Sequence, residues 1–90
     1  MSLARLNPAR DENERDIVDA LRKRDASVVR ISGPGVPDLL VGYQGRTLLL
    51  EVKAEKGKLT IAQRAFFDTW LGGPVRVVRC IDDAMRALEL

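Results

Sequence analysis

The stretch PDLLVGYQGRTLLLEVK, residues 37–53, decides the fold. Two short apolar runs, Leu39–Tyr43 and Thr47–Lys53, are bounded by proline, glycine and charged residues, as strands usually are. The pair between them, Gln44-Gly45, tolerates the positive φ of a tight turn. The stretch therefore predicts an antiparallel β-hairpin.

The register of this hairpin brings two acidic residues together. A two-residue loop pairs Tyr43 with Arg46, and counting back along the ladder sets Asp38 opposite Glu51 on the same face. A four-residue loop keeps this pairing, whereas a loop of three or five residues sends Asp38 to the other face. Alternation along the second strand places Lys53 on the face of Glu51.

Two carboxylates in such a position repel each other unless a cation or a proton offsets part of their charge. Hard oxygen ligands of this kind suit Mg²⁺ or Mn²⁺. The alternative is an exposed strand end that carries Glu51 and Lys53, with Asp38 only starting a strand after a turn. The complete pattern favours a metal site more strongly than any of its parts.

Length and composition limit the remaining possibilities. The 90 residues, 46% of them hydrophobic, predict a single domain over residues 1–90, in which residues 1–10 lack a clear period and are a candidate flexible arm. No apolar run predicts a transmembrane span or a signal peptide, and the single Cys80 excludes an internal disulfide, so we expect a cytoplasmic protein. The absence of histidine excludes Ser-His triads and imidazole-bound zinc.

The net charge of +2 is too small to indicate nucleic-acid binding by itself. The basic residues nevertheless group in segments 22–30, 53–58 and 76–86, which form either local binding patches or ordinary solvated surface. The loop that follows Lys53 carries Lys56 and Lys58, which either hold a phosphate backbone or belong to a solvated connection. Arg64 is a third candidate for contact with nucleic acid.

The rest of the chain predicts helices and strands around the hairpin. In chain order these are a helix over Asp11–Arg24, a strand over Ser27–Ser32, a helix over Thr60–Leu71, a strand over Val75–Ile81 and a helix over Asp82–Leu90. Because a helix joins the second hairpin strand to the strand at Val75, these two strands should be parallel, with a right-handed crossover. The helix over Thr60–Leu71 is expected to bury a stripe formed by Ala62, Ala65, Phe66, Thr69 and Trp70.

Two polar residues near helix starts have two interpretations each. Asp11 with Glu14, and Thr60 with Gln63, match the spacing of a capping box, which would only close the helix start. Alternatively, Glu14 reaches the carboxylate cluster as a further ligand, and Gln63 orients a water or a substrate phosphate. The two roles can coexist.

These residues together resemble the VRR-NUC branch (virus-type replication-repair nucleases) of the PD-(D/E)XK phosphodiesterase superfamily. The resemblance covers residues 12–81 and consists, in the order of the family, of Glu14 followed by Ile17, Gly35-Val36-Pro37-Asp38, Glu51-Val52-Lys53 and Gln63. It implies an α/β fold with a restriction-endonuclease-like αβββαβ core, in which helices flank a mixed sheet.

The resemblance also implies roles for individual residues. The implied catalytic residues are Glu14, Asp38, Glu51, Lys53 and Gln63. The implied ligands of Mg²⁺ or Mn²⁺ are Asp38, Glu51, the backbone carbonyl of Val52 and, as a further candidate, Glu14. In the superfamily the lysine aligns or activates the attacking water and offsets developing charge. The resemblance thus favours the functional interpretation of Glu14 and Gln63.

The implied activity is a metal-dependent DNA endonuclease that prefers branched DNA such as four-way junctions, acting in replication, repair or recombination in a bacterial or phage-infected cell. Stand-alone members of this branch are similar to junction-resolving enzymes in forming homodimers. Candidate apolar surface for a dimer includes Leu3, Leu6, Met85 and Leu88, which can equally be core residues. The alternative is a catalytically silent nucleic-acid-binding or scaffold domain, and a purely structural α/β subunit would leave the paired carboxylates unexplained.

Overall fold

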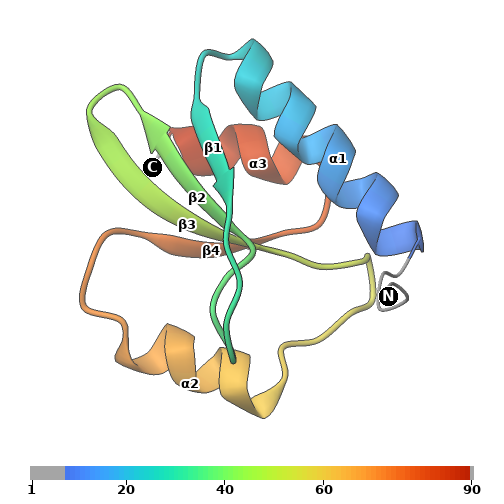
Figure 1. Cartoon of the computed structure of the whole chain (residues 1–90), viewed down its shortest axis with the longest axis vertical. Helices are drawn as coiled ribbons and strands as arrows, with labels where there is room; N and C mark the ends of the chain where they lie inside the picture. Colours follow the sequence, from blue (N-terminus) through green and yellow to red (C-terminus); the bar gives the residue numbers. More distant parts are fainter. Residues whose placement is uncertain (1–7, 90) are drawn as a thin grey trace.

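The computed structural model describes residues 8–89, and in this part of the chain one four-stranded sheet is combined with three helices (Figure 1). The elements are α1 (Pro8–Lys23), β1 (Ser27–Arg30), β2 (Leu39–Tyr43), β3 (Arg46–Val52), α2 (Ile61–Thr69), β4 (Val75–Val78) and α3 (Ile81–Leu88). The strand order is β1-β2-β3-β4, with β1, β2 and β3 antiparallel and β4 parallel to β3. The predicted α/β class, mixed sheet and parallel crossover are confirmed.

The β2–β3 hairpin has the predicted register. Tyr43 pairs with Arg46 and Leu39 pairs with Leu50, so Asp38 and Glu51 occupy the next positions of the same ladder. Gln44 and Gly45 form the turn with φ values of 50° and 79°, the left-handed region that a two-residue hairpin loop requires. The hairpin therefore delivers the two acids as expected.

The hydrophobic core lies on one face of the sheet, under α1 and α3. Alternate residues of β3 point into it, and Leu48, Leu50 and Val52 are almost completely buried. The helices contribute Ile17, Val18, Leu21, Ala84, Ala87 and Leu88. Helices α1 and α3 also touch each other, so this face of the sheet is closed.

Helix α2 stands apart from that core. None of its nine described residues is buried, and the prediction of a buried stripe on this helix is wrong. The reason is topological, because α1 and α3 cover the core face and α2 makes few contacts with the sheet. Figure 1 shows α2 separate from the other helices, with the loop that follows β1 reaching its first turn.

The ends of several elements differ from the predictions. Helix α1 begins at Pro8, three residues before the predicted start at Asp11, and residues 1–7 of the candidate arm lie outside the described part of the chain. Asp11 is inside this helix and cannot be its N-cap, so the capping-box interpretation of Asp11 and Glu14 is wrong. Strands β1 and β4 end at Arg30 and Val78, two and three residues earlier than predicted.

Two of the four candidates for apolar dimer surface lie on the C-terminal helix and belong to the core. Leu88 is 1% exposed and Met85 packs against the core, whereas Leu3 and Leu6 lie outside the described residues. Among the helices of residues 8–89, none has the length and apolar character needed to cross a membrane.

Candidate active site

A cavity of about 470 Å³ lies on the sheet face opposite the core. Its wall is formed by the loop after β1, the end of β3, the start of the next loop and the first turn of α2. The predicted site residues that line it are Asp38, Glu51, Val52, Lys53 and Gln63. The structure thus gathers in one place residues that are up to 25 positions apart in the sequence.

The two carboxylates are held by the sheet itself. Asp38 precedes β2, and its Oδ2 accepts a hydrogen bond from the backbone N–H of Val52 at 2.9 Å. Its backbone carbonyl accepts the N–H of Ile31 at 2.9 Å, which extends the β1–β2 pairing to the cavity. Glu51 is 2% exposed, one of two buried acidic residues in the described part of the chain. A buried carboxylate is costly unless charged or hydrogen-bonding groups compensate it.

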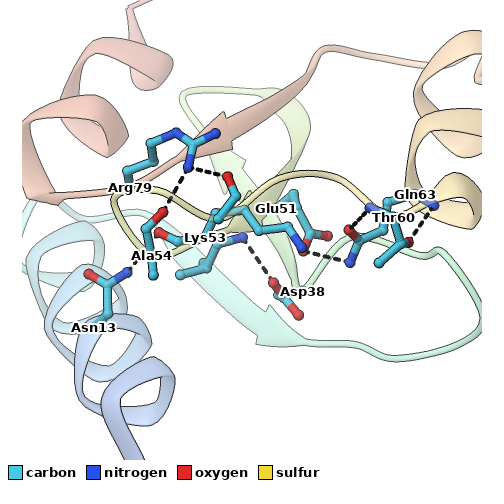
Figure 2. A network of polar contacts seen from close by, with 10 residues as sticks. Asn13, Asp38, Glu51, Lys53, Ala54, Thr60, Gln63 and Arg79 are labelled. Atoms are coloured by element: carbon cyan, nitrogen blue, oxygen red, sulfur yellow. Dashed lines mark hydrogen bonds and ion pairs between the residues drawn. The ribbon is translucent and has the colours of Figure 1, made fainter. Parts of the chain in front are cut away.

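Gln63 and Lys53 both approach the carboxylate of Glu51 (Figure 2). The Nε2 of Gln63 donates to Glu51 Oε2 at 3.1 Å, and Lys53 Nζ lies 3.9 Å from the same oxygen. Gln63 also forms the predicted capping box, since its Oε1 accepts the N–H of Thr60 at 2.8 Å and its own N–H donates to Thr60 Oγ1. An amide has both donors and an acceptor, so the two roles of Gln63 coexist.

The donor set of the cavity fits a hard divalent cation. Asp38 and Glu51 supply carboxylate oxygens. Val52, which follows Glu51 in the chain, has a backbone carbonyl that is also a hard oxygen donor. No histidine or cysteine belongs to this described lining. Oxygen ligands without nitrogen or sulfur select Mg²⁺ and Mn²⁺ over zinc.

Comparison with known protein families agrees with this geometry. The sequence model of the VRR-NUC domain matches residues 4–81 of the 90-residue chain. The chain belongs to the VRR-NUC family. It is therefore a nuclease-type domain, and the match contains every predicted catalytic residue from Glu14 to Gln63. A search among curated proteins found no significant match.

Glu14 of this VRR-NUC domain lies outside the cavity lining. Its buried carboxylate accepts a hydrogen bond from Arg30 Nε at 3.0 Å. Within the described residues no group of three or more acidic, histidine or cysteine side chains gathers as a metal site. The structure thus brings Asp38 and Glu51 together without Glu14, whose part in catalysis or metal binding stays a prediction.

The candidates for DNA contact are all exposed. Lys56 and Lys58 flank Gly57, which itself lines the cavity, so their loop borders the site. Arg64 lies on α2 and lines a separate shallow pocket that also includes Asp68. These positions are consistent with contacts at the rim of the site for the two lysines and further away for Arg64.

Sequence reasoning missed the contacts of Asn13 and Arg79 near the site, and it named Gly35 only as part of the family motif, without its close approach to α2. Asn13 Nδ2 donates to the backbone carbonyl of Lys53 at 3.1 Å, and no motif signals this contact. Gly35 has φ +74°, and a Cβ built on it would lie 2.5 Å from the carbonyl oxygen of Ala62 in α2. Arg79 follows β4, and the predicted parallel pairing of β3 and β4 was the signal that could have placed it beside Lys53.

Proposed function

We propose that this VRR-NUC domain is a Mg²⁺- or Mn²⁺-dependent DNA endonuclease that hydrolyses phosphodiester bonds. The observation that carries the proposal is the cavity in which Asp38, Glu51 and Lys53 meet on a nuclease-type domain. Burial of Glu51 beside a second acid would be unfavourable in a purely structural subunit. A cation bound by the two carboxylates would offset this repulsion. A silent DNA-binding domain would not need this arrangement.

Each of the predicted site residues in the cavity has a distinct role in the proposed reaction. Asp38, Glu51 and the Val52 carbonyl would hold the cation, and Gln63 fixes the Glu51 carboxylate through its 3.1 Å hydrogen bond. A bound divalent cation supplies polarisation of the scissile phosphate and favours ionisation of the attacking water. Lys53 donates to that water or to a non-bridging phosphate oxygen and stabilises the negative charge that develops there.

The proposed substrate is branched DNA, such as a four-way junction, in replication, repair or recombination within a bacterial or phage-infected cell. Lys56 and Lys58, exposed at the rim of the cavity, would bind the phosphate backbone, with Arg64 as a further contact. These contacts carry no sequence information, so they suit an enzyme that selects the shape of DNA.

The direct test uses purified protein and labelled duplex, flap and four-way junction DNA with Mg²⁺, Mn²⁺ or EDTA. We expect cleavage with either metal, none with EDTA, and the fastest cleavage on the junction. Cleavage in EDTA would overturn metal dependence. Binding of all three substrates without cleavage would favour the silent nucleic-acid-binding domain.

A homodimer is part of the same proposal, and the open face of the sheet supports it. Val29, Leu40, Leu49 and Val75 pair in one apolar row across all four strands. Val29 and Leu40 are 53% and 36% exposed, whereas Leu49 is buried and lines a small pocket with Trp70. Beyond the row, Leu71 is 97% exposed next to α2. Leu49 and Glu51 lie on the same face two residues apart, so a two-fold axis near this row would bring two cavities close together.

Sedimentation should therefore show a species of two 10.0 kDa chains at assay concentrations. Val29→Lys combined with Leu71→Lys is expected to give the monomer, because charges of the same sign from both chains would be placed in the buried contact. The matched control is Ile81→Lys, which alters a 43% exposed apolar residue on α3, away from the open face. A wild-type protein that stays monomeric, or a dimer that survives the double substitution, would contradict the proposed contact.

Gly35→Ala tests whether the loop after β1 positions Gln63. The new Cβ would meet the Ala62 carbonyl at 2.5 Å, so the first turn of α2 must move and carry Gln63 with it. We expect the cleavage rate to fall about tenfold or more, since displacing an active-site group by about 1 Å can cost 10²-fold. The measurement is single-turnover cleavage of the preferred DNA.

Gly45→Ala is the matched control for this change. Gly45 has φ +79°, so the backbone strain is similar, but a Cβ there meets no heavy atom within 4 Å. Both variants should lose stability through backbone strain, with a further loss in Gly35→Ala from the contact with Ala62, and cleavage by Gly45→Ala should stay close to that of the wild type. Equal rates for the two variants would show that Gly35 does not position α2.

A further inference from the structure

Arg79 lies directly after β4, the strand next to β3, and β3 ends at Val52, immediately before Lys53. The pair Val52 and Val78 closes the parallel ladder, and the N–H of Lys53 donates to the Val78 carbonyl at 3.0 Å. The residues that follow the two strands are Lys53 and Arg79, two cations at neighbouring positions at the same end of the sheet. Such a pair repels unless one charge is directed elsewhere.

The guanidinium of Arg79 is directed into the loop that follows Lys53. Its Nη1 donates to the backbone carbonyls of Ala54 at 2.7 Å, Glu55 at 3.2 Å and Gly57 at 2.7 Å. Figure 2 shows the guanidinium reaching the carbonyl oxygens of this loop. A charged donor that binds several carbonyls forms stronger hydrogen bonds than a neutral one, so Arg79 closes the loop into a defined turn.

The backbone of Arg79 is itself fixed. Its N–H donates to Asp83 Oδ2 at 2.8 Å, and this hydrogen bond lowers the pKa of the Asp83 carboxyl. The loop gains a second anchor at its beginning, where Asn13 binds the Lys53 carbonyl at 3.1 Å. The segment from Lys53 to Gly57 is thus held from both α1 and β4.

This loop forms a wall for the Lys53 side chain. A Cβ built on Gly57 would lie 3.5 Å from Lys53 Cδ, an ordinary van der Waals distance, so the backbone at Gly57 runs alongside the aliphatic part of the lysine. The lysine side chain is only 16% exposed. Moving the loop would therefore release the side chain that ends 3.9 Å from Glu51.

We propose that Arg79 is a positioning residue for Lys53, acting through the loop at residues 54–57. This inference rests on the proposed nuclease function and deepens it, because Arg79 is absent from the cavity lining and need not touch DNA. Arg79 fixes three loop carbonyls, the loop confines the lysine stem, and the ammonium group is thereby kept near Glu51. Loss of the arginine should lower turnover and leave DNA affinity nearly unchanged.

The test is a double-mutant cycle between Arg79→Met and Lys53→Met, measured by single-turnover cleavage. Arg79→Met should lower the rate about tenfold in the wild-type background and less than about twofold when Lys53→Met is already present, because coupled residues are not additive. Arg79→Lys, which keeps a charge and three donors, should fall between wild type and Arg79→Met. Equal losses in both backgrounds, or no loss at all, would overturn the inference.

The same variants distinguish this role from a phosphate contact. A contact with DNA would weaken binding and lower its salt dependence by about one phosphate, whereas a positioning residue leaves both nearly unchanged. Arg76→Met is the charge-matched control on β4, since Arg76 pairs with Leu50 and faces the α3 side of the sheet. A salt dependence altered by Arg79→Met but not by Arg76→Met would overturn the inference.

A second readout does not depend on cleavage of DNA. Limited trypsin digestion of the metal-free protein should cut after Lys56 and Lys58 several-fold faster in Arg79→Met. Apart from the cut lost at each substituted arginine, cuts elsewhere should be unchanged, and the loop of Arg76→Met should be cut as in the wild type. Unchanged digestion of the loop would overturn the inference even if the wild type cleaves DNA. A wild-type protein that cleaves no substrate would overturn the proposed function, and the digestion would then decide whether Arg79 orders the loop.

Discussion

Asp38→Asn and Glu51→Gln are each expected to reduce metal-dependent cleavage by 10³-fold or more, to the limit of detection, while the fold is retained. Either change removes one of the two carboxylates in the cavity, and a neutral amide is a poor ligand for Mg²⁺ or Mn²⁺. Loss of a single group that stabilises developing charge, such as an oxyanion-hole donor, costs about 10²–10³-fold, and loss of the cation should cost more. Full activity of Asp38→Asn would contradict the assignment.

The choice of amides makes the experiment sharp. The carbonyl oxygen of asparagine can still accept the Val52 N–H that Asp38 accepts at 2.9 Å, so Asp38→Asn tests the charge alone. Asp38→Ala removes both the charge and this hydrogen bond. If the charge is what matters, the two variants should be equally inactive, and only Asp38→Ala should lose the strand-end hydrogen bond.

Thermal unfolding supplies a readout that needs no DNA. At ten times its dissociation constant, a cation that binds only the folded state stabilises it by about 1.4 kcal/mol, and about 1 kcal/mol shifts the Tm of a domain this small by roughly 4–8 °C. The wild type should therefore have a higher Tm in Mn²⁺ than in EDTA, whereas the Tm of each amide variant should be the same in both. In EDTA, Asp38→Asn should melt slightly higher than the wild type, because one of two adjacent negative charges is gone.

The hairpin and its site could be predicted because the constraints are local. Gln44-Gly45 fixes the loop length, the loop length fixes the register, and the register places Asp38 beside Glu51. The parallel position of β4 followed from the crossover helix in the same way. Each of these steps depends on neighbouring residues or on a general rule of connection.

Helix α2 shows where such reasoning fails. Its apolar residues recur at helical spacing, and this pattern is the same whether the stripe faces a core or solvent. Which face of the sheet receives which helix is decided by α1 and α3 together, and the sequence of α2 carries no information about them. Within the stripe, Phe66 stacks on Trp70 with ring centroids 5.1 Å apart. The proposed dimer contact would cover more of this apolar surface.

The contacts of Glu14 and Gln63 differ for a related reason. Gln63 lies in the first turn of α2, where the capping box holds its amide beside Thr60 and leaves Nε2 directed at Glu51. Glu14 lies in the second turn of α1, because this helix begins at Pro8, earlier than the periodicity indicated. Its carboxylate accepts a hydrogen bond from Arg30 on β1. Equal spacing in the sequence thus produced one residue in the cavity and one outside its lining.

Lys53→Met is the second change for which we expect a large effect, about 10²-fold on turnover. Methionine keeps an aliphatic stem of similar length against Gly57 and removes the ammonium group that lies 3.9 Å from Glu51. If Lys53 aligns the attacking water and stabilises charge at the phosphate, its interactions are stronger in the transition state than in the ground state. Only interactions of this kind accelerate chemistry, so kcat should fall much more than DNA affinity.

A lysine that only binds the DNA backbone would behave in the opposite way: its loss would weaken binding and leave turnover nearly unchanged. Lys56→Met is the matched comparison, because it removes the same charge from the exposed loop beside the cavity. That variant should bind DNA more weakly, with a salt dependence reduced by about one phosphate contact, while single-turnover chemistry at saturating DNA changes little. Both variants should be measured over a salt series, with binding followed in Ca²⁺-free EDTA buffer and cleavage in Mg²⁺. Single-turnover chemistry left unchanged by Lys53→Met would exclude the catalytic role, because a side chain 16% exposed and directed at Glu51 would then act only on binding.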